Sequence, residues 1–337
     1  MAAVFPINTS NSTFPATTAF NTSPSYSGTF IPQLWSAKLN VKFYAATVFG
    51  EISNTNWEGE IKGMGDTITI NNIPDITISS YSVGAGLSYQ VPTPSTLTLQ
   101  INKGKYFAFQ VSDVLEYQAK PKLMDVFSND AAMKMKIAID STVIYNTFQG
   151  AAAANIGATA GANTSSYNLG TDTAPVALNA ANVLQLLTAF SGVLDEQNVP
   201  ETDRWLVIDP YTRQLLMQSN LAQAQFMGDS ESMVRNGRIG KIDRFTVYVS
   251  NQLPRAAAGS NTPYVSGDGT ENTITSTGSA KRRILIAGHK SAITFASQMT
   301  KTETVRNPND FGDFVRGMNV FGYTTSKSQA LTYAVVS

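Results

Sequence analysis

The sequence predicts an α+β protein in which long strands and one long helix precede a compact unit of alternating helices and strands. Between residues 60 and 111, apolar and polar residues alternate with the period of two that strands show. Between residues 123 and 148, apolar residues recur every three or four positions, as they do along a helix. Residues 179–220 combine both patterns, which indicates a helix, a strand and a second helix.

The first 37 residues contain no charged side chain, and Lys38 is the first. The segment is rich in Ser, Thr, Asn and Pro, so it is either a disordered tail or an extended arm. Its spaced aromatic residues favour an arm that lies across neighbouring copies, because solvated tails are usually poor in aromatics. The expected aromatic anchors are Phe14, Phe20 and Phe30. From Pro32 onward a helix is expected, with Trp35 on its apolar face.

Residues 60–111 are expected to form one long antiparallel hairpin with a flexible tip at 81–94. Ile68 and Ile70 alternate with threonines in the first strand. Leu97 and Leu99 do the same in the returning strand. The alternation continues to Val111, with Phe107, Phe109 and Val111 facing inward.

The segment 113–149 is expected to be helical, with its regular part between Leu123 and Phe148. At 1.5 Å per residue this part would be about 39 Å long, which suggests a spine. Gly150 ends it, and residues 150–178 are expected to form a loop or insertion, because they are mostly Ala, Gly, Asn, Thr and Ser.

The compact unit begins with a helix that carries Val183, Leu186, Leu187, Phe190 and Leu194 on one face. A buried strand at 204–208 follows, and Asp209 and Pro210 are expected to cap and open the next helix.

Further strands are expected at 245–249 and 283–287, and residues 318–336 also have a strand-like pattern. Residues 255–280 are polar and rich in Gly, Ser and Thr, so they are expected to form a second insertion.

Only 14% of the residues are charged, and 24 basic side chains balance 24 acidic ones. Ordinary soluble domains carry about 25% charged residues, so much of this surface is expected to be covered, most simply by copies of the chain. Zero net charge argues against a protein that wraps nucleic acid. Neither a targeting segment nor an apolar run long enough to cross a membrane is visible.

The residues that enzymes need are scarce. The chain has no cysteine and a single histidine, His289, which is expected to make a local hydrogen bond rather than to act in catalysis with Ser291. The acidic residues at 266–271 fit a turn better than a calcium loop, and the acidic pair beside Trp57 fits a solvated strand end better than a glycosidase site. We therefore expect no catalytic, metal or cofactor site.

Two charged clusters are candidates for contacts between copies. Arg235, Arg238, Lys241 and Arg244 recur every three residues, and salt bridges to a neighbouring copy are expected rather than phosphate binding. The second cluster alternates in sign and includes Arg306, Asp310, Asp313 and Arg316. Trp57 and the hairpin residues Ile68, Ile70, Leu97 and Leu99 are further candidates.

Four phrases in this order resemble the major capsid proteins of tailed bacteriophages, which share the Hong Kong 97-type coat fold. Residues 31–36 (Ile-Pro-Gln-Leu-Trp-Ser) are similar to the phrase that ends the N-terminal arm. Residues 65–70 resemble the rising strand of the extended loop, and residues 240–254 resemble a strand phrase of the axial domain. Residues 311–317 (Phe-Gly-Asp-Phe-Val-Arg-Gly) resemble a turn of the peripheral domain.

The resemblance implies five parts of the chain. They are an N-terminal arm (1–59), an extended loop over the next subunit (60–111), a peripheral domain with the spine helix and an insertion (112–178), an axial domain with insertion 255–280 (179–290), and a return to the peripheral domain (291–337).

The implied function is that of a coat protein that forms hexamers and pentamers of an icosahedral shell around double-stranded DNA. The implied partners are a separate scaffolding protein, a portal and a decoration protein, with weak non-specific contact to the packaged DNA and no membrane. The virion is the implied location, after assembly in the host cytoplasm. Some relatives crosslink through a lysine in the extended loop, but residues 67–101 contain no lysine, so no crosslinking is expected.

Three other classes remain open at this stage. An encapsulin-like compartment shell has the same fold and holds cargo enzymes. A β-rich tail protein or adhesin would lack the long helix. A hydrolase is disfavoured by the single histidine and the lack of cysteine.

Overall fold

The computed structural model describes most of the chain from Tyr44 to Ser337. The described residues are 44–57, 67–74, 76–84, 86–113, 117, 123–219, 240–259, 262–267, 271–275, 277–308 and 311–337. The predicted arm anchors Phe14, Phe20, Phe30 and Trp35 and the charged residues Arg235, Arg238 and Asp310 lie outside these ranges.

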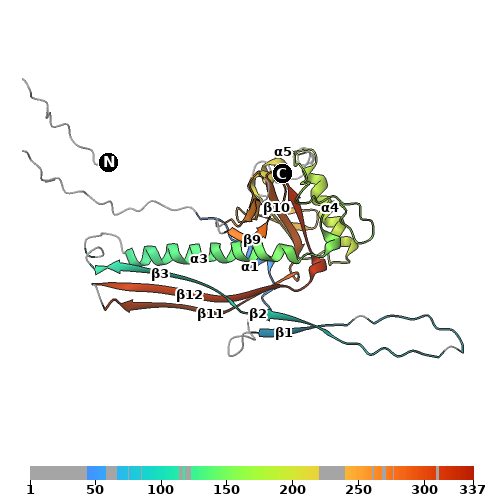
Figure 1. Cartoon of the computed structure of the whole chain (residues 1–337), viewed down its shortest axis with the longest axis horizontal. Helices are drawn as coiled ribbons and strands as arrows, with labels where there is room; N and C mark the ends of the chain where they lie inside the picture. Colours follow the sequence, from blue (N-terminus) through green and yellow to red (C-terminus); the bar gives the residue numbers. More distant parts are fainter. Residues whose placement is uncertain are drawn as a thin grey trace, which may run out of the picture. The chain divides into compact units, whose positions relative to one another are not determined.

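A two-stranded hairpin carries the long loop that the sequence predicts. β1 (Thr67–Asn72) pairs antiparallel with β2 (Ser95–Gln100), and Ile68 lies opposite Leu99. Between the strands, the described residues 73–74, 76–84 and 86–94 continue outward as an open loop (Figure 1). The hairpin prediction is confirmed for these residues.

The predicted hairpin ends earlier than residue 111, which corrects its boundary. β3 (Lys103–Ser112) does not belong to it, because it pairs antiparallel with β12 (Gly312–Thr325) in a separate sheet. β11 (Ile293–Arg306) pairs with the other side of β12. The alternation of β3 is as predicted, with Phe107 and Phe109 half-buried and Val111 buried. Alternation of apolar and polar residues indicates that a strand has one apolar and one polar face, but it does not identify the strand with which it pairs.

The predicted spine helix is α3 (Leu123–Thr147), and it runs along the three-stranded sheet (Figure 1). Phe127 of α3 meets Phe109 of β3 edge to face, with ring centroids 6.0 Å apart. Toward its C-terminal end the helix enters the main core, where Val143, Ile144 and Tyr145 are buried. The short helix α1 (Phe49–Ile52) packs on α3.

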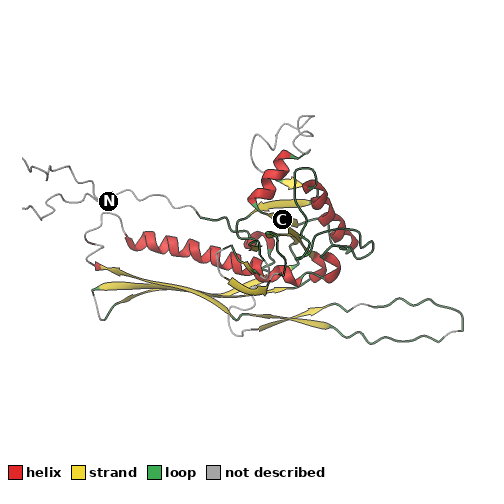
Figure 2. Ribbon diagram, turned by 45° about the horizontal axis from the view of Figure 1, so that its top comes forward, coloured by secondary structure: helices red, strands yellow, loops and turns green. Residues whose placement is uncertain are grey.

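The main core is built around an eight-stranded sheet with α4 and α5 (Figure 2). The sheet has the order β5-β6-β4-β10-β7-β8-β9, and β13 also pairs with β10. The two helices are α4 (Val183–Glu196) and α5 (Pro210–Gln218). The strands of the sheet are β4 (Arg204–Ile208), β5 (Lys241–Ile242), β6 (Phe245–Val249), β7 (Arg255–Ala256), β8 (Pro263–Val265), β9 (Glu271–Thr275), β10 (Arg282–His289) and β13 (Leu331–Val336).

Local predictions for this unit are confirmed. All five residues of β4 are buried, and the predicted face of α4 is buried as well. The Asp209 side chain accepts a hydrogen bond from the Thr212 amide at 3.1 Å and so caps α5, while Pro210 is its first residue.

Two boundary predictions are wrong. Residues 255–280 are not a simple insertion, because β7, β8 and β9 extend the large sheet. The C-terminal segment does not return as a whole to the three-stranded sheet, because β13 pairs with β10 from Arg283 to Gly288. Short polar strands carry a weak sequence pattern, so their place in a sheet depends on distant partners.

Two buried arginines fasten the surrounding segments to the large sheet. Arg282 contacts Asp172 of the segment 150–178 at 3.2 Å, and its side chain has no exposed surface. Arg204 contacts Asp195 at the end of α4 at 2.7 Å and is equally buried. Removing either acidic partner would leave a buried arginine charge uncompensated, so these contacts hold the loop and the helix in place.

The hairpin rests on the three-stranded sheet through a small apolar cluster. Its buried members are Leu99, Ile101 and Ala296. At Gly322 of β12, a β-carbon would overlap the Gln100 carbonyl oxygen at the end of β2. Only glycine allows the two backbones to approach this closely.

We therefore expect Gly322→Ala to lower the free energy of unfolding by about 1–3 kcal/mol, because the added methyl group meets backbone that has little room to move. The measurement is urea unfolding followed by near-ultraviolet circular dichroism. Gly104→Ala is the matched control, since a β-carbon there meets nothing within 4 Å. Equal losses in both variants would contradict this account of the contact.

Candidate assembly surfaces

The loop between β1 and β2 exposes an unusual amount of apolar surface. Eight of its large apolar side chains are between 64% and 95% exposed: Ile73, Ile76, Ile78, Tyr81, Val83, Leu87, Tyr89 and Val91. From Ile76 to Ile101 the sequence contains no charged residue. Exposed apolar surface of this kind, without charge, is typical of a surface that a partner covers.

The sequence prediction placed contacts in the strands of the hairpin rather than in this loop. Leu99 is fully buried inside the chain, so its assignment as a contact between copies is corrected. Ile68 and Ile70 are half-buried against the same small cluster, and Leu97 is half-buried as well. The lack of charge together with the alternation of residues 87–91 was the signal that could have identified the loop itself.

A second apolar surface is the face of the three-stranded sheet that points away from α3. Tyr106 of β3 lies opposite Met318 of β12, and Phe314 of β12 lies opposite Val305 of β11. Residues in register on neighbouring strands share a face. Tyr106 is 81% exposed, and the other three are between 37% and 42% exposed.

The predicted charged contacts at this end of the sheet are paired within the chain. Arg306 contacts Asp113 and lies 3.3 Å from Asp313, and Arg316 contacts Glu303 at 2.7 Å. The Arg306 hydrogen bond lowers the pKa of Asp113, and Lys301 and then Arg316 lower the pKa of Glu303. Exposed pairs of this kind add little stability, so their contact with another copy remains a prediction. Trp57, which the sequence also predicts as a contact between copies, is half-buried in the single chain.

A groove of about 460 Å³ lies between α3 and β3. Its apolar lining includes Phe107, Phe109, Phe127, Ala131, Met135 and Ala138, and Tyr106 also borders it. Lys105 and Lys134 also line it, as does Asp130, whose carboxylate accepts a hydrogen bond from the Tyr44 hydroxyl at 2.8 Å. No residue of β11 or β12 lines the groove.

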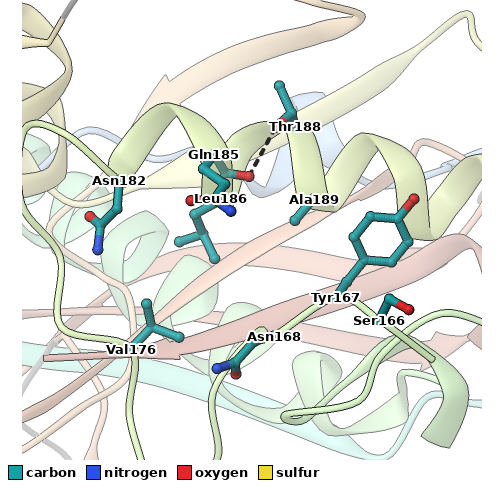
Figure 3. A pocket seen from close by; sticks show the side chains of 9 residues that line it. All are labelled: Ser166, Tyr167, Asn168, Val176, Asn182, Gln185, Leu186, Thr188 and Ala189. Atoms are coloured by element: carbon teal, nitrogen blue, oxygen red, sulfur yellow. Dashed lines mark hydrogen bonds between the residues drawn. The ribbon is translucent and has the colours of Figure 1, made fainter. Parts of the chain in front are cut away.

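A larger concavity of about 600 Å³ lies beside α4 (Figure 3). Neutral polar side chains line it, among them Gln185 of α4, Asn182 just before α4, and Tyr167 and Asn168 of the segment 150–178. Apart from the Tyr167 phenol, none of its lining side chains can exchange a proton, so it lacks the groups that acid–base catalysis needs.

His289 makes the local contact that the sequence predicts. Its Nδ1 lies 2.7 Å from the Ser291 hydroxyl, and the Ser291 backbone amide donates to the same nitrogen at 3.1 Å. Burial lowers the pKa of His289, which favours the neutral ring. The Ser–His pair therefore closes a turn between residues two apart in the chain.

One buried carboxylate joins the segment before the hairpin to the spine helix. Asp140 of α3 has no exposed surface, and its Oδ1 accepts hydrogen bonds from the amides of Val48 and Phe49 at 3.0 and 2.8 Å. Burial raises the pKa of Asp140 to about 6, against the opposing effect of these two hydrogen bonds.

Over the residues that the structure describes, no group of three or more His, Cys, Asp or Glu side chains could hold a metal ion. No helix in those same ranges is long and apolar enough to cross a membrane. The prominent features are instead uncovered apolar surfaces on an extended loop, a sheet face and a groove. Such surfaces define a structural protein that works as part of an assembly.

A family model described as "Phage capsid protein" matches residues 95–334. The chain therefore belongs to the phage capsid protein family, and it is a major capsid protein that forms the shell of a virion. The family implies a structural role, and it favours neither a compartment shell with cargo enzymes nor a tail protein or adhesin.

Solved structures with similar folds come from several phages. "Mycobacterium phage Che8" is 22% identical with a TM-score of 0.68, and the match covers 90% of this chain and 96% of that chain. "Capsid structure of the Cyanophage P-SCSP1u" is 17% identical with a TM-score of 0.69, covering 91% and 93%. "Asymmetric unit of bacteriophage PhiM1 mature capsid" is 13% identical with a TM-score of 0.62, covering 90% and 91%. Among curated protein sequences, no significant match was found.

The buried Asp140 predicts a specific pH dependence of stability. Its pKa is raised in the folded chain, so the folded state holds the proton more tightly than the unfolded state does. Ionisation therefore costs stability above pH 6, by about 3 kcal/mol, and this cost disappears as the pH falls toward 4. Asp140→Asn is neutral at every pH and lacks this dependence.

Urea unfolding of wild type and Asp140→Asn at pH 4.5 and pH 8 measures the effect. The stability of the variant relative to wild type should be about 2–3 kcal/mol more favourable at pH 8 than at pH 4.5. Asp125→Asn, at an exposed position in the first turn of the same helix, is the matched control for the loss of one carboxylate. A difference that stays constant across this range would rule out the assignment.

Proposed function

We propose that the chain assembles into hexamers and pentamers of an icosahedral shell with the Hong Kong 97-type arrangement, around double-stranded phage DNA. The observation that carries this proposal is the loop at residues 73–94, in which Asp75 is the single charged residue and eight large apolar side chains are exposed in the single chain. Exposed apolar side chains gathered in this way are typical of a site that another molecule covers.

In this proposal the hairpin β1–β2 with its loop is the extended loop and lies over the next subunit. α3 and the three-stranded sheet form the peripheral domain, and the eight-stranded sheet with α4 and α5 forms the axial domain. The N-terminal arm reaches neighbouring copies through its aromatic residues, and the charged residues around Arg235 and Arg306 contact adjacent subunits. The topology supports these divisions, because each sheet has its own strands and α3 contributes to the packing of both.

The proposed partners follow from the same function. A separate scaffolding protein directs assembly in this proposal. A portal and a decoration protein complete the particle, and contact with the DNA is weak and non-specific because the chain has no net charge. Assembly takes place in the host cytoplasm, and the subunit has no catalytic role.

Electron microscopy of the purified full-length chain, expressed with its phage scaffolding protein, is the direct test. Closed shells are the expected result, and a soluble monomer as the sole product would overturn the proposal. Denaturing electrophoresis of the same shells should give a single monomer band, because residues 67–101 contain no lysine for a crosslink. A ladder of covalent oligomers would show that the prediction about crosslinking is wrong.

A further inference from the structure

The proposed assembly leaves the concavity beside α4 without a role (Figure 3). Its volume of about 600 Å³ lies within the roughly 300–1,000 Å³ that small-molecule sites occupy. One wall follows α4, along which Asn182, Gln185 and Ala189 recur every three or four residues and so share a face. The other wall is the segment 166–168 together with Val176. The cavity therefore has the size and the two-sided form of a small-molecule site.

The wall opposite α4 is held in place by hydrogen bonds of the chain itself. Tyr167 and Ala160 exchange two backbone hydrogen bonds, at 2.8 and 3.0 Å. The Glu196 carboxylate at the end of α4 accepts hydrogen bonds from the backbone amides of Asn163 and Thr164 at 2.8 and 3.2 Å. The cavity thus has its shape before any ligand enters, and a preformed site loses less conformational entropy on binding.

The lining offers hydrogen-bond donors and acceptors together. The exposed Gln185 amide has no hydrogen-bond partner among the residues that the structure describes, so it can donate and accept. The Asn168 Oδ1 accepts a hydrogen bond from the Gly170 amide at 2.9 Å, which leaves its NH₂ group as a donor. The Thr188 hydroxyl donates to the Gln185 carbonyl at 2.9 Å and keeps its oxygen as an acceptor. This mixture suits a ligand with hydroxyl groups, because each hydroxyl also donates and accepts.

Apolar and aromatic surface lies beside these polar groups. Leu186 is buried at the cavity, and Val176 and Ala189 are half-buried. The half-buried Tyr167 ring lies close against α4 at Gly192, where a β-carbon would overlap the phenol. A sugar ring has hydroxyl groups around its edge and apolar C–H groups on its faces. Amide groups beside an aromatic ring and aliphatic side chains can contact both parts.

The lining disfavours the other classes of ligand. Among the described residues, no aspartate, glutamate, histidine, lysine or arginine lines the cavity. A phosphate, a carboxylate or an ammonium group would therefore enter without a counter-charge, at a much higher desolvation cost than a neutral hydroxyl. A peptide that binds as an added strand needs an open strand edge. None of the lining residues belongs to a described β-strand, so the cavity lacks such an edge.

We propose that the cavity beside α4 binds a neutral saccharide. The amide groups of Gln185 and Asn168 bind its hydroxyl groups, and Tyr167 and Leu186 contact the C–H groups of a sugar ring. This inference goes beyond the proposed function, because it gives each subunit of the shell an attachment site for neutral glycans in addition to its part in enclosing DNA.

Saturation-transfer difference NMR on assembled shells of the full-length chain tests this directly. The probes are three neutral disaccharides, namely maltose, cellobiose and N,N′-diacetylchitobiose. At least one of them should bind saturably, with a Kd of about 1 mM or lower. The same disaccharide with one C6 hydroxyl oxidised to a uronic acid should bind at least about tenfold more weakly, because its carboxylate meets no counter-charge in the cavity.

Two variants locate the binding in this cavity. Gln185→Ala removes the amide from an exposed helical position and should weaken binding about three- to tenfold, which corresponds to the loss of one hydrogen bond. Ala189→Trp fills the space between the two walls and should weaken binding at least about tenfold. Gln214→Ala removes an exposed glutamine from α5, away from the cavity, and is the matched control. Its Kd should stay within about twofold of wild type.

The outcomes separate this inference from the proposed function. If none of the three probes binds to wild-type shells, or if Gln185→Ala binds as tightly as Gln214→Ala, the inference is overturned. Binding by unassembled chains but not by shells would also overturn it, because a neighbouring copy would then cover the cavity. If wild type forms no shells under any condition that folds the chain, the proposed function fails, and titration of the unassembled chain still tests the cavity.

Discussion

The rest of the structure depends on the burial of the C-terminal part of α3 in the main core. Val143, Ile144 and Tyr145 are completely or almost completely buried there, and the Tyr145 hydroxyl donates to the Tyr264 carbonyl at 2.9 Å. The N-terminal part of the same helix lies on the three-stranded sheet. Because an α-helix is stiff over this length, the two sheets are held at a fixed separation by one continuous element. The hairpin is held against the three-stranded sheet by its small apolar cluster with β11 and β12.

Low charge and exposed apolar surface have a common physical meaning in this chain. A single copy leaves the loop at residues 73–94, the outer sheet face and the groove uncovered. Each surface carries few charged side chains, and grouped exposed apolar side chains are typical of interaction sites. Burial between copies removes this surface from water, and many modest contacts then add up over a closed shell. The charged pairs at the tip of β11 and β12 are already satisfied within the chain, so they shape the surface more than they drive association.

The sequence allowed the individual elements to be predicted better than their partners. The spine helix, the β1–β2 hairpin, the cap at Asp209 and the buried strand β4 all depend on local signals, and all are confirmed. β3 pairs with residues about two hundred positions later in the chain, and β13 pairs with residues about fifty positions earlier. Alternation contains no information about such distant pairing. Leu99 could not be assigned correctly for a similar reason. The sequence shows that this position is apolar, but it does not show whether the side chain is covered by the same chain or by another copy. The groove could not be predicted at all, since it exists only where α3 crosses the edge of β3.

The position of β13 also has a consequence for the timing of folding. It completes the large sheet by pairing with β10 from Gly288 to Arg283, and four of its six residues, Leu331, Ala334, Val335 and Val336, are buried apolar side chains. The sheet therefore cannot close until residue 336 has left the ribosome. Nascent chains therefore lack a complete large sheet until β13 has been synthesised, so recognition between subunits that requires the folded chain must follow that step.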